Sequence, residues 1–66
     1  MSKKYFSHQK AIVESLNIGK NTRIWAFTHI MQDAIIGSDC NIGECCFIEN
    51  DVIIGNGVTI KNGVSI

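Results

Sequence analysis

The feature that most constrains this chain is a ladder of isoleucines that recur at every sixth position. Ten of the twelve isoleucines fall in this one register, which comprises Ile12, Ile18, Ile24, Ile30, Ile36, Ile42, Ile48, Ile54, Ile60 and Ile66. A step of six fits neither the helical period nor the plain alternation of a strand, and it is typical of a parallel β-helix built from hexapeptides. We therefore expect an all-β fold, a parallel β-helix.

The other positions of the hexapeptide are also regular. The fifth position is small or apolar throughout, and it holds Leu16, Thr22, Thr28, Ala34, Cys40, Cys46, Val52, Val58 and Val64. We expect this residue to point inward at a corner of the coil. Glycines at the second position, together with Gly57 and Gly63 at the fourth, should give the backbone freedom near the bends. If three hexapeptides make one triangular coil, residues 18 apart stack. The chain then forms about three coils, with Ile12, Ile30, Ile48 and Ile66 in one inward column.

The ladder divides the chain into two parts. Residues 1–11 lie outside it and are interpreted as an N-terminal capping segment, in which Tyr5 and Phe6 cover the open top of the core; the alternative is a frayed terminus. Residues 12–66 form the hexapeptide β-helix, without proline or a linker-like run. An inward Ile66 without a polar cap leaves an apolar cross-section open, so we expect the helix to continue beyond it.

Composition argues against several classes of partner. Six basic and six acidic residues cancel without a run of either sign, so we expect no nucleic-acid partner. There is no apolar leader and no stretch approaching the roughly 20 apolar residues that span a bilayer, so we expect a cytoplasmic protein without a membrane partner. Cys40, Cys45 and Cys46 are an odd count, which favours reduced thiols. Cys45 is the one expected to face outward.

The outward positions carry an unusual number of apolar side chains, namely Trp25, Phe27, Met31, Ile35, Phe47 and Ile53. Exposed apolar patches of this kind usually mark an interface. We therefore predict side-by-side packing of prisms in a closed cyclic oligomer. Trp25, Phe27 and Phe47 are predicted to form a substrate or interface wall.

His29 falls on the same outward face and is the candidate catalytic residue. A histidine beside aromatic side chains is able to act as a general base or to contact a ligand at a subunit boundary. The alternative is an interface histidine satisfied by hydrogen bonds, because spacing alone places no Asp, Glu or Ser to complete a triad. His8 is interpreted as structural, and the sequence contains no phosphate-binding glycine loop.

The hexapeptides resemble those of the hexapeptide-repeat acyltransferases. IGKNTR, IGSDCN, IENDVI and IGNGVT match that family's pattern in full, and the resemblance covers residues 12–66. It implies a left-handed β-helix, an exception to the right-handed crossover rule. A narrower stretch, RIWAFTHI at residues 23–30 with the IG-x-x-C-N-IG run at 36–43, is similar to N-acetyltransferases that modify nucleotide-linked 3-amino sugars, some of them fused to a sugar ketoisomerase. Ala26 replaces a second histidine that many of them have.

The resemblance carries expectations about function. It implies a homotrimer with active sites between prisms, acetyl-CoA as co-substrate along the groove, a nucleotide-sugar substrate whose amine is the nucleophile, and a role in surface polysaccharide biosynthesis. The cofactor-binding stretches of that family come later than Ile66. We therefore expect residues 1–66 to supply the first coils and part of an intersubunit wall, and to be inactive alone.

Two other functions remain open on the sequence. Carbonic anhydrases of the same fold hold zinc with three histidines, whereas this chain offers His8 and His29; we expect no metal. A non-catalytic structural or oligomerisation module is the second alternative, since a fold does not imply a function. Within that class, ice-binding helices need regular rows of threonine, and Thr22, Thr28 and Thr59 form no row.

Overall fold

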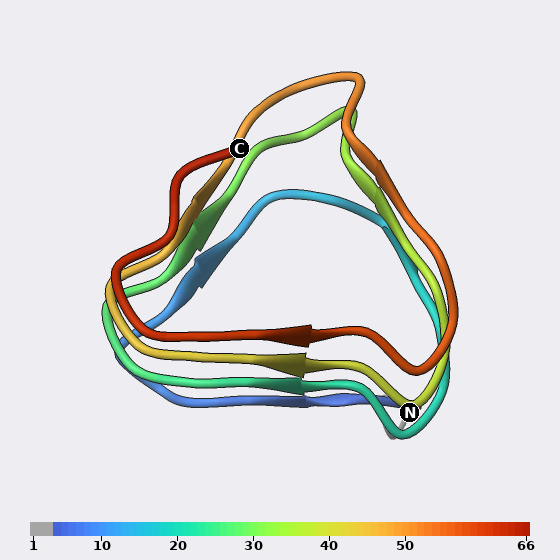
Figure 1. The fold of residues 1–66 in the computed structure, drawn as a ribbon, viewed down its shortest axis with the longest axis horizontal. Helices are drawn as coiled ribbons and strands as arrows, with labels where there is room; N and C mark the ends of the chain where they lie inside the picture. Colours follow the sequence, from blue (N-terminus) through green and yellow to red (C-terminus); the bar gives the residue numbers. More distant parts are fainter. Residues whose placement is uncertain (1–3) are drawn as a thin grey trace.

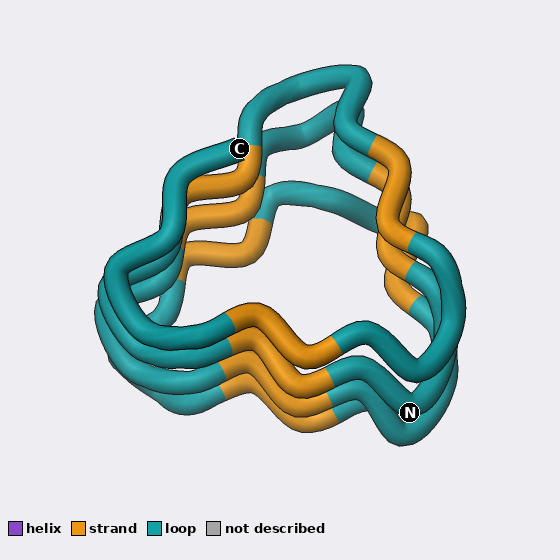
Figure 2. The backbone as a smooth tube through the Cα atoms, viewed as in Figure 1, coloured by secondary structure: helices purple, strands orange, loops and turns teal. Residues whose placement is uncertain are grey.

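The computed structural model describes residues 4–66, which form a triangular prism wound from short strands (Figure 1). Each strand has two residues, and the rest of each coil consists of turns and extended connections (Figure 2). The strands are β1 (Phe6–Ser7), β2 (Ile12–Val13), β3 (Asn17–Ile18), β4 (Arg23–Ile24), β5 (His29–Ile30), β6 (Ile35–Ile36), β7 (Asn41–Ile42), β8 (Phe47–Ile48), β9 (Ile53–Ile54) and β10 (Thr59–Ile60).

Successive strands belong to different faces of the prism, so each face receives every third strand. Sheet A contains β1, β4, β7 and β10; sheet B contains β2, β5 and β8; sheet C contains β3, β6 and β9. All of these pairings are parallel. The chain turns clockwise in Figure 1 from the blue coil behind to the red coil in front, which is the sense of a left-handed helix. The predicted left-handed parallel β-helix of about three coils is confirmed.

The isoleucine ladder from Ile18 to Ile60 forms the core. Ile24, Ile30, Ile42 and Ile48 have no exposed surface, and the least covered members of this run are 7% exposed. Each face therefore stacks isoleucine on isoleucine at the coil spacing, as the ladder predicts. Burial of one such side chain contributes roughly 1.5–3 kcal/mol, which makes this column packing the main source of stability.

The fifth-position side chains lie at the corners and bond to the next coil. Thr28 Oγ1 donates to the carbonyl of Gly43 at 2.5 Å and accepts from the amide of Cys46 at 3.2 Å. One coil later the thiol of Cys46 points to the carbonyl of Lys61 at 3.1 Å. Buried hydroxyls and thiols are thus paired, as polar groups in a core must be. The same arrangement links Thr22 to Gly37 and Cys40 to Gly55.

The first coil is one residue shorter than the ladder predicts. Val13, and not Ile12, lies opposite Ile30, because β2 pairs with β5 at an offset of 17 residues. Ile12 is 57% exposed and Leu16 is 95% exposed. The prediction that both point inward is wrong. The corner between β2 and β3 holds one residue fewer than its counterparts, and Ser15 takes the inward place, donating to the carbonyl of Ala34 at 2.6 Å.

The fourth position adopts the left-handed backbone conformation at most corners. Gly57 and Gly63 have φ of 70° and 75°, as predicted for these glycines. Phe27 and Cys45 adopt the same conformation, with φ of 63° and 60°. This region is unfavourable for bulky residues. The inter-coil hydrogen bond from the amide of Phe27 to the carbonyl of Lys10 helps to hold it there.

The two ends of the prism can be compared with the predicted segments, residues 1–11 and residues 12–66. In the segment 1–11, β1 already belongs to sheet A, and Tyr5 packs against the core. Phe6 instead faces outward and is 47% exposed. Residues 1–3 of the predicted capping segment 1–11 lie outside the described residues. At the other end, the bridge from Phe47 to Ser65 sets Ile66 in line with Ile48, and Ile66 is 46% exposed.

Candidate functional site

The outward apolar side chains divide into exposed and partly covered groups. Phe27 is 62% exposed and Ile53 is 75% exposed, whereas Trp25 and Phe47 are half-buried. Ile53 lies beside Ile35 in sheet C, which is itself 45% exposed, so the two form an apolar pair on that face. The predicted stacking of residues 18 apart is confirmed for this pair.

His29 lies on the outer face of sheet B, between Ile12 and Phe47. The three residues are aligned by the pairing of β2, β5 and β8. The imidazole meets the phenyl ring of Phe47 edge to face, with ring centroids 5.6 Å apart and an interplanar angle of 76°. Of the predicted wall residues, Phe47 is therefore the one that the structure places against the candidate catalytic residue.

Glu14 completes this site, and the sequence analysis did not identify it. Its Oε2 lies 3.5 Å from Nε2 of His29. Nε2 is buried and has no hydrogen-bond partner among the described residues 4–66, although this carboxylate lies close to it. The arrangement is an imidazole beside a carboxylate, which is suited to holding or passing a proton. Glu14 comes near His29 through the short first corner, a feature of the structure for which the sequence spacing gives no signal.

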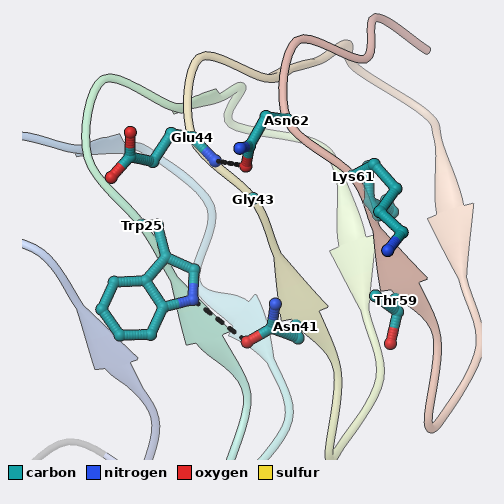
Figure 3. A pocket seen from close by; sticks show the side chains of 8 residues that line it. Trp25, Asn41, Gly43, Glu44, Thr59, Lys61 and Asn62 are labelled. Carbon is teal, nitrogen blue, oxygen red and sulfur yellow. Dashed lines mark hydrogen bonds between the residues drawn. The ribbon is translucent and has the colours of Figure 1, made fainter.

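A second concave region lies on the face of sheet A and is an open groove of about 640 Å³. Trp25 forms one side, Thr59 and Lys61 the other, and Asn41 and Gly43 the floor between them (Figure 3). Glu44 and Asn62 close the end near the corner of the prism. The groove is therefore built by three successive coils of one face.

Trp25 is held in place on both edges. Its Nε1 donates to Oδ1 of Asn41 at 3.0 Å, and the ring of Phe6 packs against it at a centroid distance of 5.3 Å and an angle of 57°. Trp25 lies on the face of sheet A, His29 and Phe47 lie on sheet B, and Phe27 occupies the corner between the two sheets. The predicted wall residues thus belong to two adjoining faces.

The histidines and thiols are dispersed over the molecule. Nδ1 of His8 accepts a hydrogen bond from the amide of Lys10 at 3.0 Å, in keeping with the structural role predicted for it. Cys40 and Cys46 are buried and Cys45 is exposed, as predicted. Within residues 4–66 no three His, Cys, Asp or Glu side chains gather as a metal site would require.

The same residues contain no helix long and apolar enough to cross a membrane.

Comparison with known proteins gives two matches. Residues 16–50, more than half of the chain, match the family model described as bacterial transferase hexapeptide (six repeats). The chain is also similar to the dTDP-3-amino-3,6-dideoxy-alpha-D-galactopyranose 3-N-acetyltransferase of Aneurinibacillus thermoaerophilus, with 62% identity over 32 residues. These residues are 48% of this chain and 17% of that relative, so the match spans a small part of the relative's length.

Proposed function

Because the chain belongs to the bacterial transferase hexapeptide family, we propose that its protein transfers an acetyl group from acetyl-CoA to the amine of a nucleotide-linked 3-amino sugar. The observation that carries the proposal is the 62% identity to a 3-N-acetyltransferase whose name specifies a dTDP-linked 3-amino sugar. The RIWAFTHI stretch at residues 23–30, which contains His29, adds the resemblance to the same class of enzymes.

The proposed reaction requires one proton transfer that the described residues are placed to assist. The sugar amine attacks the thioester carbonyl to form the amide bond, the carbon–sulfur bond breaks, and the proton that the nitrogen loses is passed through the base to the CoA thiolate, which leaves as a thiol. His29 is the candidate to accept that proton, since its side chain lies on the outer face of sheet B and is 35% exposed. The carboxylate of Glu14 at 3.5 Å would stabilise the imidazolium formed.

The proposed active unit is a homotrimer with the sites between neighbouring prisms. The exposed Phe27, Ile35 and Ile53 support this assembly, because apolar side chains of this size at 62%, 45% and 75% exposure favour a protein partner. In this assembly the half-buried Trp25 and Phe47 form part of the wall of the site. We further propose that the enzyme acts in the cytoplasm, in surface polysaccharide biosynthesis.

Acetyl transfer by the full-length protein that carries this sequence tests the proposal. With acetyl-CoA and a dTDP-linked 3-amino sugar we expect stoichiometric release of CoA thiol, and no release with the corresponding 3-hydroxy sugar. Calorimetric titration of acetyl-CoA should give heat with the full-length protein, and we expect no turnover by residues 1–66 alone. Absence of binding to the full-length protein, or stoichiometric zinc in it, would contradict the proposal.

A further inference from the structure

Hydrogen bonds fix the orientation of the Asn41 amide in the groove on sheet A. Its Oδ1 accepts from Nε1 of Trp25 at 3.0 Å and from Nε of Arg23 at 3.1 Å. Both partners are donors, so the oxygen must face them and the NH₂ group must point the other way. That NH₂ has no acceptor among residues 4–66. Asn41 therefore offers two unused donors to whatever occupies the groove.

The far side of the groove carries a cation without a paired acid. Lys61 is exposed, and the described part of the chain contains a single close ion pair, between His29 and Glu14. Thr59 adds a hydroxyl beside Lys61. Figure 3 shows the carboxylate of Glu44 pointing away from the Lys61 ammonium, on the Trp25 side. The Thr59 and Lys61 end is thus the one suited to an anion.

The near side of the groove offers an aromatic surface. Figure 3 shows the indole of Trp25 broadside, with its nitrogen toward Asn41 and the bare backbone of Gly43 beyond it. Trp25 and Lys61 occupy coils that are two steps apart, which is about 9.6 Å between their backbones at the spacing of paired strands. A ligand that contacts both must therefore be longer than a single phosphate, and a planar ring at one end would stack on the indole.

We propose that this groove binds the nucleoside diphosphate portion of a co-substrate, with the base on Trp25 and the phosphates near Lys61 and the NH₂ of Asn41. Stacking of bases on aromatic rings and lysine contacts to phosphate are common in nucleotide recognition. The inference rests on the proposed function, because the nucleotide sugar and acetyl-CoA both carry this chemistry. The test must separate these two sources.

Calorimetric titration of the full-length protein with dTDP, with 3′-phosphoadenosine 5′-diphosphate and with inorganic phosphate distinguishes them. We expect one of the two nucleotides to bind at this groove and phosphate alone to bind far more weakly. Quenching of Trp25 fluorescence by that nucleotide, absent in Trp25→Phe, would place the base. Trp25 is the only tryptophan within residues 1–66, and the Trp25→Phe variant separates its signal from that of any other tryptophan in the full-length protein. Equal affinity for phosphate and both nucleotides would overturn the assignment of an aromatic subsite.

Two variants and one matched control locate the phosphates. Lys61→Met removes the cation, and Asn41→Asp keeps the oxygen that accepts from Trp25 and Arg23 while replacing the NH₂ donors. Each should weaken binding of the same nucleotide by about ten-fold or more. Lys20→Met removes an exposed cation at a different corner and should leave affinity unchanged. If Lys61→Met and Asn41→Asp bind both nucleotides like the unmodified protein, the inference fails.

The binding assay separates this inference from the proposed reaction. Nucleotide binding that depends on Lys61 and Asn41 without acetyl transfer would support the groove and reject the proposed function. Acetyl transfer with nucleotide affinity independent of both residues would support the function and reject the groove. The thermal unfolding temperature of Asn41→Asp is the folding control. If it equals that of the unmodified protein, the lower affinity does not come from a loss of folding.

Discussion

The carboxylate of Glu14 lies 3.5 Å from Nε2 of His29, although the two residues come from different coils. The contact exists because the corner after β2 is one residue short, which sets Ile12 beside His29 and places Glu14 two residues further along the same outward side. A carboxylate beside a histidine restricts the orientation of the imidazole ring. This pair is accordingly the first target for mutation.

His29→Asn in the full-length enzyme should lower kcat about 100-fold, the range for loss of a general base. Glu14→Gln should lower kcat about ten-fold, since it removes the charge that stabilises the imidazolium while keeping the side-chain size. Steady-state kinetics with the proposed nucleotide sugar and acetyl-CoA measure both effects. Glu49→Gln is the control, because Glu49 is an exposed acid in the same outward column as Glu14 and, among the described residues, makes no ion pair with His29. Unchanged kcat with a raised KM in His29→Asn would make His29 a binding residue.

The free energy of unfolding of two variants tests the register of the first coil. Val13→Ser should lower the free energy of unfolding by about 1.5 kcal/mol, because Val13 lies in the inward column opposite Ile30. Ile12→Ser should change it by less than about 0.5 kcal/mol, since Ile12 is 57% exposed. Urea unfolding followed by circular dichroism gives both values. A larger loss for Ile12→Ser than for Val13→Ser would restore the simple hexapeptide register.

The glycines at the second position of the hexapeptide differ in which atoms of the next coil lie close to them. A Cβ on Gly37 would lie 2.4 Å from Oδ1 of Asn56 and 2.8 Å from the backbone of the coil below it, so Gly37→Ala should destabilise the chain by about 2 kcal/mol. A Cβ on Gly55 would meet nothing within 4 Å. In the 66-residue chain, Gly55→Ala should therefore stay within about 0.5 kcal/mol of the unmodified protein. Equal losses at Gly37 and Gly55 would refute the steric explanation.

The proposed trimer depends on the apolar face of sheet C. Ile53→Glu should shift the full-length protein from trimer to monomer, because a charge placed on a side chain that is 75% exposed would be buried unpaired in the interface. Sedimentation velocity measures the shift. Gln32→Glu adds the same charge at an exposed corner position and should leave the mass unchanged. A trimer that persists in Ile53→Glu would place the interface on another face.

Much of the fold follows from the repeat alone. A six-residue step with a large inward residue and a small corner residue fixes the coil length, so the stacks through Ile24, Ile42 and Ile60 are predictable without coordinates. The first coil breaks this logic, because Ile12 keeps the step of six while the corner after it loses one residue. Spacing in sequence cannot reveal a shortened corner when the next isoleucine still falls in register.

The candidate site is only partly predictable for the same reason. His29, Trp25, Phe27 and Phe47 are identifiable as outward residues from their places in the hexapeptide. Their grouping depends on which sheet each strand joins, and the choice of Asn41 as the acceptor for Trp25 depends on side-chain conformation.

The sequence by itself determined the prism, because burying the isoleucines that recur at every sixth position from Ile18 to Ile60 requires the chain to wind into stacked coils. Only the tertiary structure decided the chemistry on the outside. It set Glu14 against His29 through a corner of altered length, and it aimed the NH₂ of Asn41 into the groove because two donors hold its oxygen. Outward side chains are not constrained by burial, so their contacts arise from the spatial neighbours that the coils supply.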